Sequence, residues 1–159
     1  MKTTLAAIYL VLLCMSPALA DDRDKIIGVW KLQTWEVVFQ DTGERKALYG
    51  LNPTGFVIFT PEGRMMALLT AEGRKTPQTD ADRAAAFRNM FAYSGIYNLE
   101  KDRWVTKVDA SWNEAWTGTE QVRFYLLEED KLTVTTAWAP TLNFEGRIAQ
   151  GILTWIKVR

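Results

Sequence analysis

The side chains able to carry out acid–base chemistry in this chain are carboxylates and tyrosines. The sequence contains no histidine, and its only cysteine is Cys14. Serine–histidine triads, cysteine nucleophiles and the common zinc sites need those residue types. A carboxyl group or a tyrosine in an apolar pocket could still act as a general acid or base, because burial raises the pKa of a carboxyl group. The candidates are Glu36, Tyr93, Tyr97, Asp109, Glu114 and Glu120. The sequence also lacks a glycine-rich phosphate loop and a calcium loop, so it predicts no cofactor and no metal.

Arg123 is a second residue of chemical interest, because it alternates with Gln121 and Tyr125. Residues two apart in a strand share a face. If that face points inward, an unpaired guanidinium would be costly and would need an anion. Three arrangements are open: an internal ion pair with Glu36, a bound ligand carboxylate, or an outward-facing Arg123.

Aromatic residues are abundant on the expected strands, and such rings form the walls of many apolar ligand sites. Trp112 and Trp116 flank a short polar break, which predicts that both indoles lie at one end of the sheet. The predicted ligand-binding residues are Glu36, Phe59, Tyr93, Tyr97, Trp112, Trp116, Arg123, Tyr125 and Trp138.

Alternating runs separated by turn signals predict the strands that position these side chains. In the first strand, alternation places Trp30, Thr34 and Glu36 on the inward face and Lys31 and Gln33 on the wetter one. The expected strands are 28–39, 55–60, 64–70, 93–99, 104–111, 118–128, 131–138 and 147–158. Short connections between them favour an all-β, up-and-down antiparallel barrel, and eight strands close around one small ligand.

One short helix is expected at about 80–91, with Thr79 or Asp80 as its cap. Phe87, Met90 and Phe91 on this helix must cover apolar surface. They lie either on the side of the barrel, as ordinary packing, or at its entrance, as a lid.

Residues 1–20 have the pattern of a secretory signal peptide. Lys2 precedes an apolar run at 5–13, and a small-x-small site ends at Ala20. The run is too short to span a membrane as a helix. We therefore expect cleavage after Ala20, a periplasmic or secreted product, and one domain over 21–159. The chain has 19 basic and 19 acidic residues, well mixed, which argues against a nucleic-acid partner.

Five stretches in order resemble the lipocalin-like domain family of the calycin group. They are Gly28-x-Trp30, Phe59 to Met65, Phe91 to Tyr97, Trp116 to Arg123 and Leu153 to Trp155. The resemblance implies a barrel with a hydrophobic cavity and a helix inserted between the third and fourth strands. It also implies a basic side chain stacked on the Trp30 indole, supplied by Lys157 or Arg159.

This chain departs from the family pattern in the strand before Trp112, which often carries histidine. Lys107 and Asp109 stand in that region, so a histidine-dependent function does not carry over.

The sequence therefore predicts an exported barrel that binds a small hydrophobic or amphipathic molecule. Two other functions stay open. One is a non-redox cyclase, isomerase or hydratase that uses a carboxylate or a tyrosine. The other is an envelope protein whose outer surface, not its cavity, binds a partner.

Overall fold

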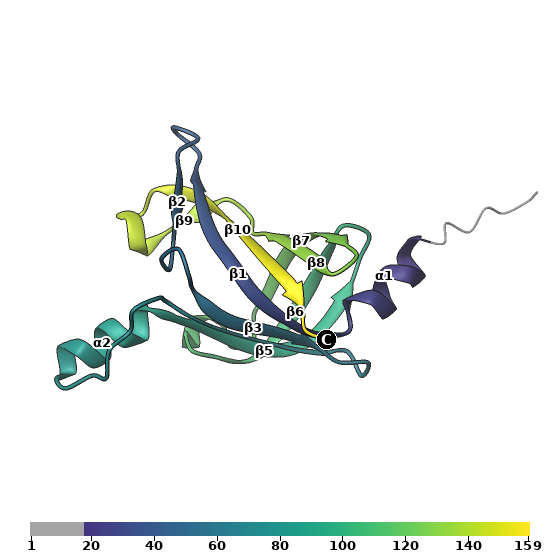
Figure 1. Cartoon of the computed structure of the whole chain (residues 1–159), viewed down its shortest axis with the longest axis horizontal. Helices are drawn as coiled ribbons and strands as arrows, with labels where there is room; N and C mark the ends of the chain where they lie inside the picture. The colour runs from purple at the N-terminus through teal and green to yellow at the C-terminus, as the bar shows by residue number, and fades with distance from the viewer. Residues whose placement is uncertain (1–17) are drawn as a thin grey trace, which may run out of the picture.

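The computed structural model describes residues 18–159, which form a single antiparallel sheet with short helices at its ends (Figure 1). The strands are β1 (Gly28–Phe39), β2 (Arg45–Ala47), β3 (Thr54–Phe59), β4 (Arg64–Thr70), β5 (Met90–Leu99), β6 (Arg103–Ser111), β7 (Glu120–Glu128), β8 (Lys131–Thr135), β9 (Ala139–Pro140) and β10 (Ile148–Lys157). The α-helices are α1 (Ala18–Ile26) and α2 (Asp80–Arg88), and the 3₁₀ turns are η1 (Glu114–Trp116) and η2 (Leu142–Phe144).

The sheet closes into a barrel because β1 pairs with β3 on one side and with β10 on the other. Around the barrel the order is β1, β3, β4, β5, β6, β7, β8 and β10, with every pair antiparallel. The predicted eight-stranded up-and-down barrel is confirmed. The short strands β2 and β9, which lie in predicted loops, extend the sheet beside β1 and β10.

The helix between the third and fourth barrel strands forms where the sequence predicts it but ends earlier. Thr79 caps it: the Thr79 hydroxyl accepts from the Asp82 amide at 3.1 Å, and the Asp82 carboxylate accepts from the Thr79 amide at 2.9 Å. Asn89 ends α2, and β5 begins at Met90 because that residue pairs with β4. Phe91 therefore belongs to the sheet.

A β-bulge in β1 changes which of its residues face inward. The register of β1 against β10 shifts between Leu32 and Thr34. Because the bulge inserts one extra residue into β1, the side chains that follow it point to the opposite face from the one that simple alternation predicts. Trp35 therefore faces inward and is 8% exposed, whereas the Glu36 carboxylate lies outside and accepts from Arg45 Nη1 at 3.4 Å. The predicted inward orientation of Thr34 and Glu36 is wrong.

The end of the barrel near α1 is packed shut around Trp30, which is fully buried. Its indole Nε1 donates to the Ile26 carbonyl at 2.7 Å, and Lys157 Nζ lies 5.1 Å from the ring centroid. The predicted cation over this indole is confirmed, with Lys157 in that place. Gly28, the first residue of β1, has φ +127°, in the region of positive φ that favours glycine.

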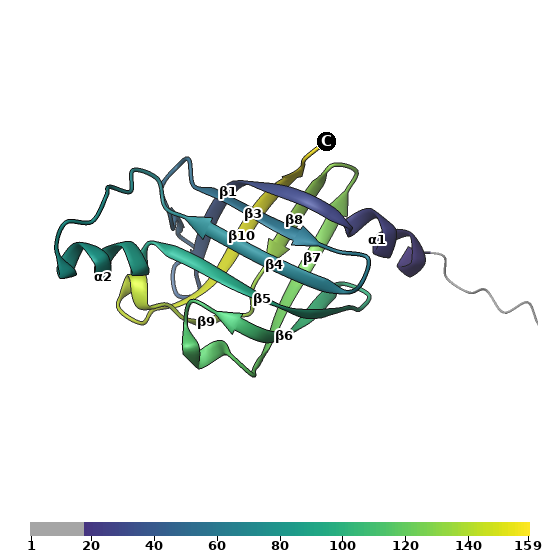
Figure 2. The ribbon, with the colours of Figure 1, turned by 90° about the horizontal axis from the view of Figure 1, so that it is seen from below.

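Helices α1 and α2 lie at opposite ends of the barrel (Figure 2). No residue of α2 is buried, and Phe87 is 51% exposed, so α2 does not pack as a covering layer on the barrel wall. Residues 1–17 of the predicted signal peptide lie outside the described residues, and α1 runs through the predicted cleavage point after Ala20. Within residues 18–159, no helix has the length and apolar character needed to cross a membrane.

Candidate ligand-binding cavity

A cavity of about 820 Å³ lies inside the barrel, and Phe87 and Arg88 of α2 contribute to its lining. Small-molecule sites usually measure roughly 300–1,000 Å³. Inward-facing side chains from most barrel strands form its walls because alternate residues of each strand point to the centre. The aliphatic part of the lining includes Val37, Leu48, Val57, Met65, Ala67, Leu69, Val134, Ala149 and Leu153.

Aromatic rings form a connected wall around Phe91. The Phe91 ring centroid lies 5.3 Å from that of Trp35, 4.6 Å from that of Trp112 and 5.4 Å from that of Trp116. Most of these contacts are edge-to-face, the arrangement that aromatic quadrupoles favour. Trp112 and Trp116 are held together because η1 turns the chain back at the end of β6, with the Asn113 side chain capping the turn. The wall is therefore stiff as well as apolar.

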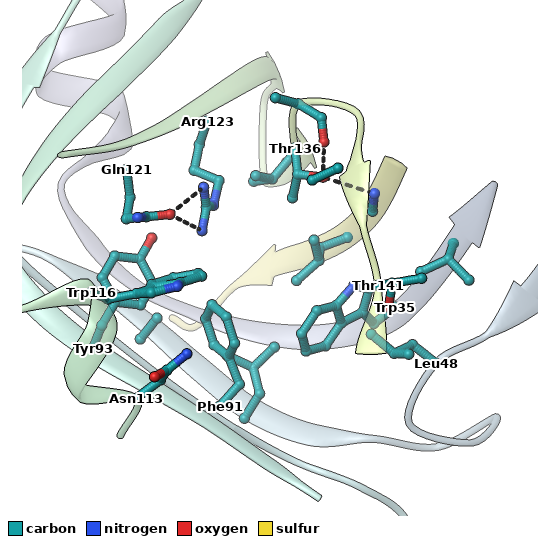
Figure 3. Close-up of a pocket in the computed structure, with 18 of the residues that line it drawn as sticks. Trp35, Leu48, Phe91, Tyr93, Asn113, Trp116, Gln121, Arg123, Thr136 and Thr141 are labelled. Carbon is teal, nitrogen blue, oxygen red and sulfur yellow. Dashed lines mark hydrogen bonds between the residues drawn. The ribbon is translucent and has the colours of Figure 1, made fainter. Parts of the chain in front are cut away.

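Arg123 is the one buried cationic residue in the described part of the chain, at 8% exposed. It projects from β7 over the cavity, above Trp116 and beside Gln121 (Figure 3). The guanidinium carbon lies 5.6 Å from the Tyr93 ring centroid and 5.4 Å from that of Trp116. Its Nη1 donates to the Val122 carbonyl at 2.8 Å, and Nη1 and Nη2 share the Gln121 Oε1 at 3.4 Å.

Arg123 has no carboxylate within ion-pair distance among residues 18–159, although six other arginines in that range pair with one. Those residues are Arg45, Arg64, Arg83, Arg103, Arg147 and Arg159. The predicted internal pair of Arg123 with Glu36 is wrong, because the β1 bulge turns Glu36 outward to Arg45. Arginine stays charged in proteins, so this buried charge is offset only by neutral acceptors and two rings.

The open end of the cavity has a more polar rim, to which Arg88, Asn113, Glu120 and Asn143 contribute. Tyr49 supports this end: its hydroxyl donates to the Met90 carbonyl at 2.9 Å, which ties the segment before β3 to the start of β5. Burial raises the pKa of Tyr49 to about 12, so the hydroxyl keeps its proton and remains a donor at neutral pH.

Four of the predicted ligand-binding residues line this cavity: Tyr93, Trp112, Trp116 and Arg123. The other five lie elsewhere. Glu36 is on the outer surface, and Trp138, which is 44% exposed, follows β8 outside the lining.

Phe59, Tyr97 and Tyr125 belong to the packed end of the barrel. The Phe59 ring lies 5.1 Å from that of Tyr97, and the Tyr97 hydroxyl donates to the Thr60 carbonyl at 3.3 Å. The Tyr125 hydroxyl donates to Asp22 Oδ2 at 3.3 Å. These three residues therefore fill the interior that the ligand was expected to occupy at this end.

The sequence prediction missed Trp35, Phe91, Tyr49 and Gln121 as cavity residues. A signal for Trp35 was present, because the adjacent polar residues Gln33 and Thr34 interrupt the alternation where the bulge lies. The local pattern predicts Phe91 on the helix, and Tyr49 lies outside the expected strands. No local pattern shows that a loop folds against a distant strand.

The carboxylates considered for acid–base chemistry lie mostly outside the cavity. Asp109, on the outer face, accepts from Ser94 and Arg64, and these bonds lower its pKa. Tyr93 and Glu120 are the two candidates that do line the cavity. An isomerase or cyclase function stays a prediction that would now depend on those two. The described residues hold no group of three or more metal-ligating side chains.

The chain is thus an antiparallel barrel that β1 and β10 close, with an apolar cavity inside. Residues 27–158 match the lipocalin-like domain, and the chain belongs to that family. No curated protein matches the chain by sequence.

Seven chains of solved structures are similar to this one, and two of them come from Bacteroides species. One is a lipocalin-like protein from Bacteroides uniformis ATCC 8492, with 12% sequence identity and a TM-score of 0.46 over 84% of this chain and 99% of that one. The other is an uncharacterized protein from Bacteroides eggerthii DSM 20697, with 17% identity and a TM-score of 0.44 over the same shares.

Proposed function

We propose that this protein is exported and binds a small amphipathic molecule inside the barrel. The observation that carries the proposal is the pairing of an apolar cavity of about 820 Å³ with one buried arginine that has no acidic partner among residues 18–159. Apolar walls with a few placed polar groups are the usual composition of a small-molecule site.

The apolar walls favour a ligand with a substantial hydrocarbon or ring portion. Burial of apolar surface contributes about 25 cal/mol per Å², so a ligand that covers much of this lining gains several kcal/mol. The rings around Phe91 lock one another in place. The ligand therefore meets a largely preformed surface and loses little affinity to ordering of the protein.

Export is supported by the sequence of residues 1–20, with its early lysine, apolar run and small-x-small ending. Expression of the full chain in a bacterium, followed by mass measurement of the periplasmic fraction, tests this part. A mature protein that begins at Asp21 supports export, and an uncleaved cytoplasmic product contradicts it.

The binding proposal is tested with a variant that fills the cavity. Ala67 lies on β4, is 4% exposed and lines the cavity, so Ala67→Phe places a ring in the space the ligand would occupy. Ala110 is exposed on β6 outside the lining, and Ala110→Phe is the matched control. Native mass spectrometry and tryptophan fluorescence titration with medium-chain lipids measure the binding.

We expect saturable binding to the wild type and to Ala110→Phe, and binding to Ala67→Phe that is weaker by about tenfold or more, since the new ring removes the apolar contact surface. Equal binding by the two variants would place the ligand outside the barrel. No binding of any probe to the wild type would contradict the proposal.

A further inference from the structure

The hydrogen-bonding pattern of Arg123 identifies the chemical class of the cavity ligand. This inference rests on the proposed function, since it concerns the same cavity. A guanidinium has five N–H donors in a planar fork. Three of them are used: both on Nη1, to Val122 and Gln121, and one on Nη2, to Gln121.

The positions of the three N–H groups that already donate determine which edge of the Arg123 guanidinium is free. Gln121 Oε1 accepts from Nη1 and Nη2 together, so it occupies the edge between those two atoms. The Val122 carbonyl takes the other Nη1 hydrogen. The two remaining donors are Nε–H and the second Nη2–H, which are parallel and share one edge. Within residues 18–159 neither of them has an acceptor.

Two parallel N–H groups match the two oxygens of a carboxylate. Elsewhere in this chain, Arg147 uses this same edge, with Nε and Nη2 donating to the two oxygens of Asp41 at 3.3 Å and 2.7 Å. Such fork-shaped pairs combine geometric specificity with charge-assisted strength. Arg123 thus presents, at a buried site, the edge that Arg147 uses for a carboxylate at the surface.

The surroundings favour a single negative charge. Arg123 is the only buried cation among the described residues, and its guanidinium lies against neutral groups: the Val122 carbonyl, the Gln121 amide and the rings of Tyr93 and Trp116. A phosphate monoester carries nearly two charges at neutral pH, and one guanidinium surrounded by apolar side chains compensates only one. We infer that the ligand is a monocarboxylic acid whose carboxylate binds the Nε and Nη2 edge of Arg123 while its apolar body lies against the aromatic wall. Gln121 holds the guanidinium in this orientation.

The experiment compares ligands that share one apolar chain and differ in the head group. Decanoate, 1-decanol and decyl phosphate are titrated at neutral pH into the wild type, Arg123→Met and Arg123→Lys, by calorimetry and tryptophan fluorescence. Arg147→Met, which removes an arginine outside the cavity lining, is the matched control.

The wild type and Arg147→Met are expected to prefer decanoate over decanol by about tenfold or more, because a bidentate charged pair is lost with the alcohol. Arg123→Met should lose that preference while it still binds decanol, and Arg123→Lys should fall between, since lysine keeps the charge but not the fork.

The possible outcomes separate the two proposals. Equal binding of decanoate and decanol by the wild type, or an unchanged preference in Arg123→Met, would overturn the carboxylate assignment and leave the cavity proposal standing. Tighter binding of decyl phosphate than of decanoate would also overturn it, in favour of a dianion. If none of the three probes binds the wild type, both proposals fail.

Discussion

Replacement of Arg123 by methionine should leave the stability of the barrel nearly unchanged, although Arg123 is buried. The substitution removes the hydrogen bond to the Val122 carbonyl at 2.8 Å, worth about 1.5–3 kcal/mol for a charged donor. The contacts with the rings of Tyr93 and Trp116, at 5.6 Å and 5.4 Å, add about 0.5–2 kcal/mol each. The same substitution relieves the cost of keeping an unpaired charge out of water, which is several kcal/mol.

These contributions nearly cancel, so we expect the free energy of unfolding to change by no more than about 1 kcal/mol in either direction. The outcome for a buried ion pair would differ sharply, because breaking such a pair costs about 3–5 kcal/mol. The change in the free energy of unfolding on Arg123→Met therefore distinguishes a ligand-binding role of Arg123 from a structural one.

Urea unfolding at pH 7, followed by tryptophan fluorescence and circular dichroism, measures the change at constant m-value. Arg147→Met is the comparison. Arg147 pairs with Asp41 at 2.7 Å, and its guanidinium carbon lies 3.7 Å from the Phe39 ring centroid, so its loss should destabilise the fold. A loss of 3 kcal/mol or more in Arg123→Met would refute the reasoning and show that Arg123 is a structural residue.

Two further predictions concern stability. Gly28→Ala should lower the free energy of unfolding by about 1–3 kcal/mol, because φ at Gly28 is +127° and the new Cβ would lie 3.3 Å from Lys157 Cε. Gly43→Ala is the control, since φ at Gly43 is +70° but the space around it is open, and it should cost less in the same urea assay. Equal losses in the two variants would contradict this prediction. Burial is the main cause that raises the pKa of Tyr49 and of Tyr125 to about 12, so the fold favours the protonated phenols. Their stabilisation is complete below pH 10 and is lost as pH rises from 10 to 12, by at most about 2 kcal/mol in total once solvent screening is included. The loss of stability between pH 10 and 12 should be smaller in Tyr49→Phe than in the wild type. If it is unchanged in the variant that carries both Tyr49→Phe and Tyr125→Phe, these two phenols are not its source.

The sequence alone was enough to predict the barrel. Alternating runs and turn signals are local, and each of the eight predicted strands forms within a few residues of its expected bounds. The capping box at Thr79 and the cation over Trp30 were also predictable, since one depends on neighbouring residues and the other on a motif with a known partner position.

The binding site was predictable only in part. Parity within β7 put Arg123 on one face with Gln121 and Tyr125 but left open whether that face points inward; Arg123 is buried in the structure. In β1, one inserted residue reversed the faces, which brought Trp35 into the cavity and sent Glu36 to the surface. A bulge depends on how two strands of distant sequence pair, so alternation in one strand does not specify it.

Only the tertiary structure decided which end of the barrel is open and whether Arg123 has a partner. Ile26 and Trp30 fill one end, while Phe91 and Trp116 line the cavity at the other. These arrangements depend on closure of β1 against β10, which brings together residues more than a hundred positions apart. The sequence determined the strands and the residue types available to the interior. The closed sheet determined which of them face an apolar space, and among residues 18–159 it brings no carboxylate to Arg123.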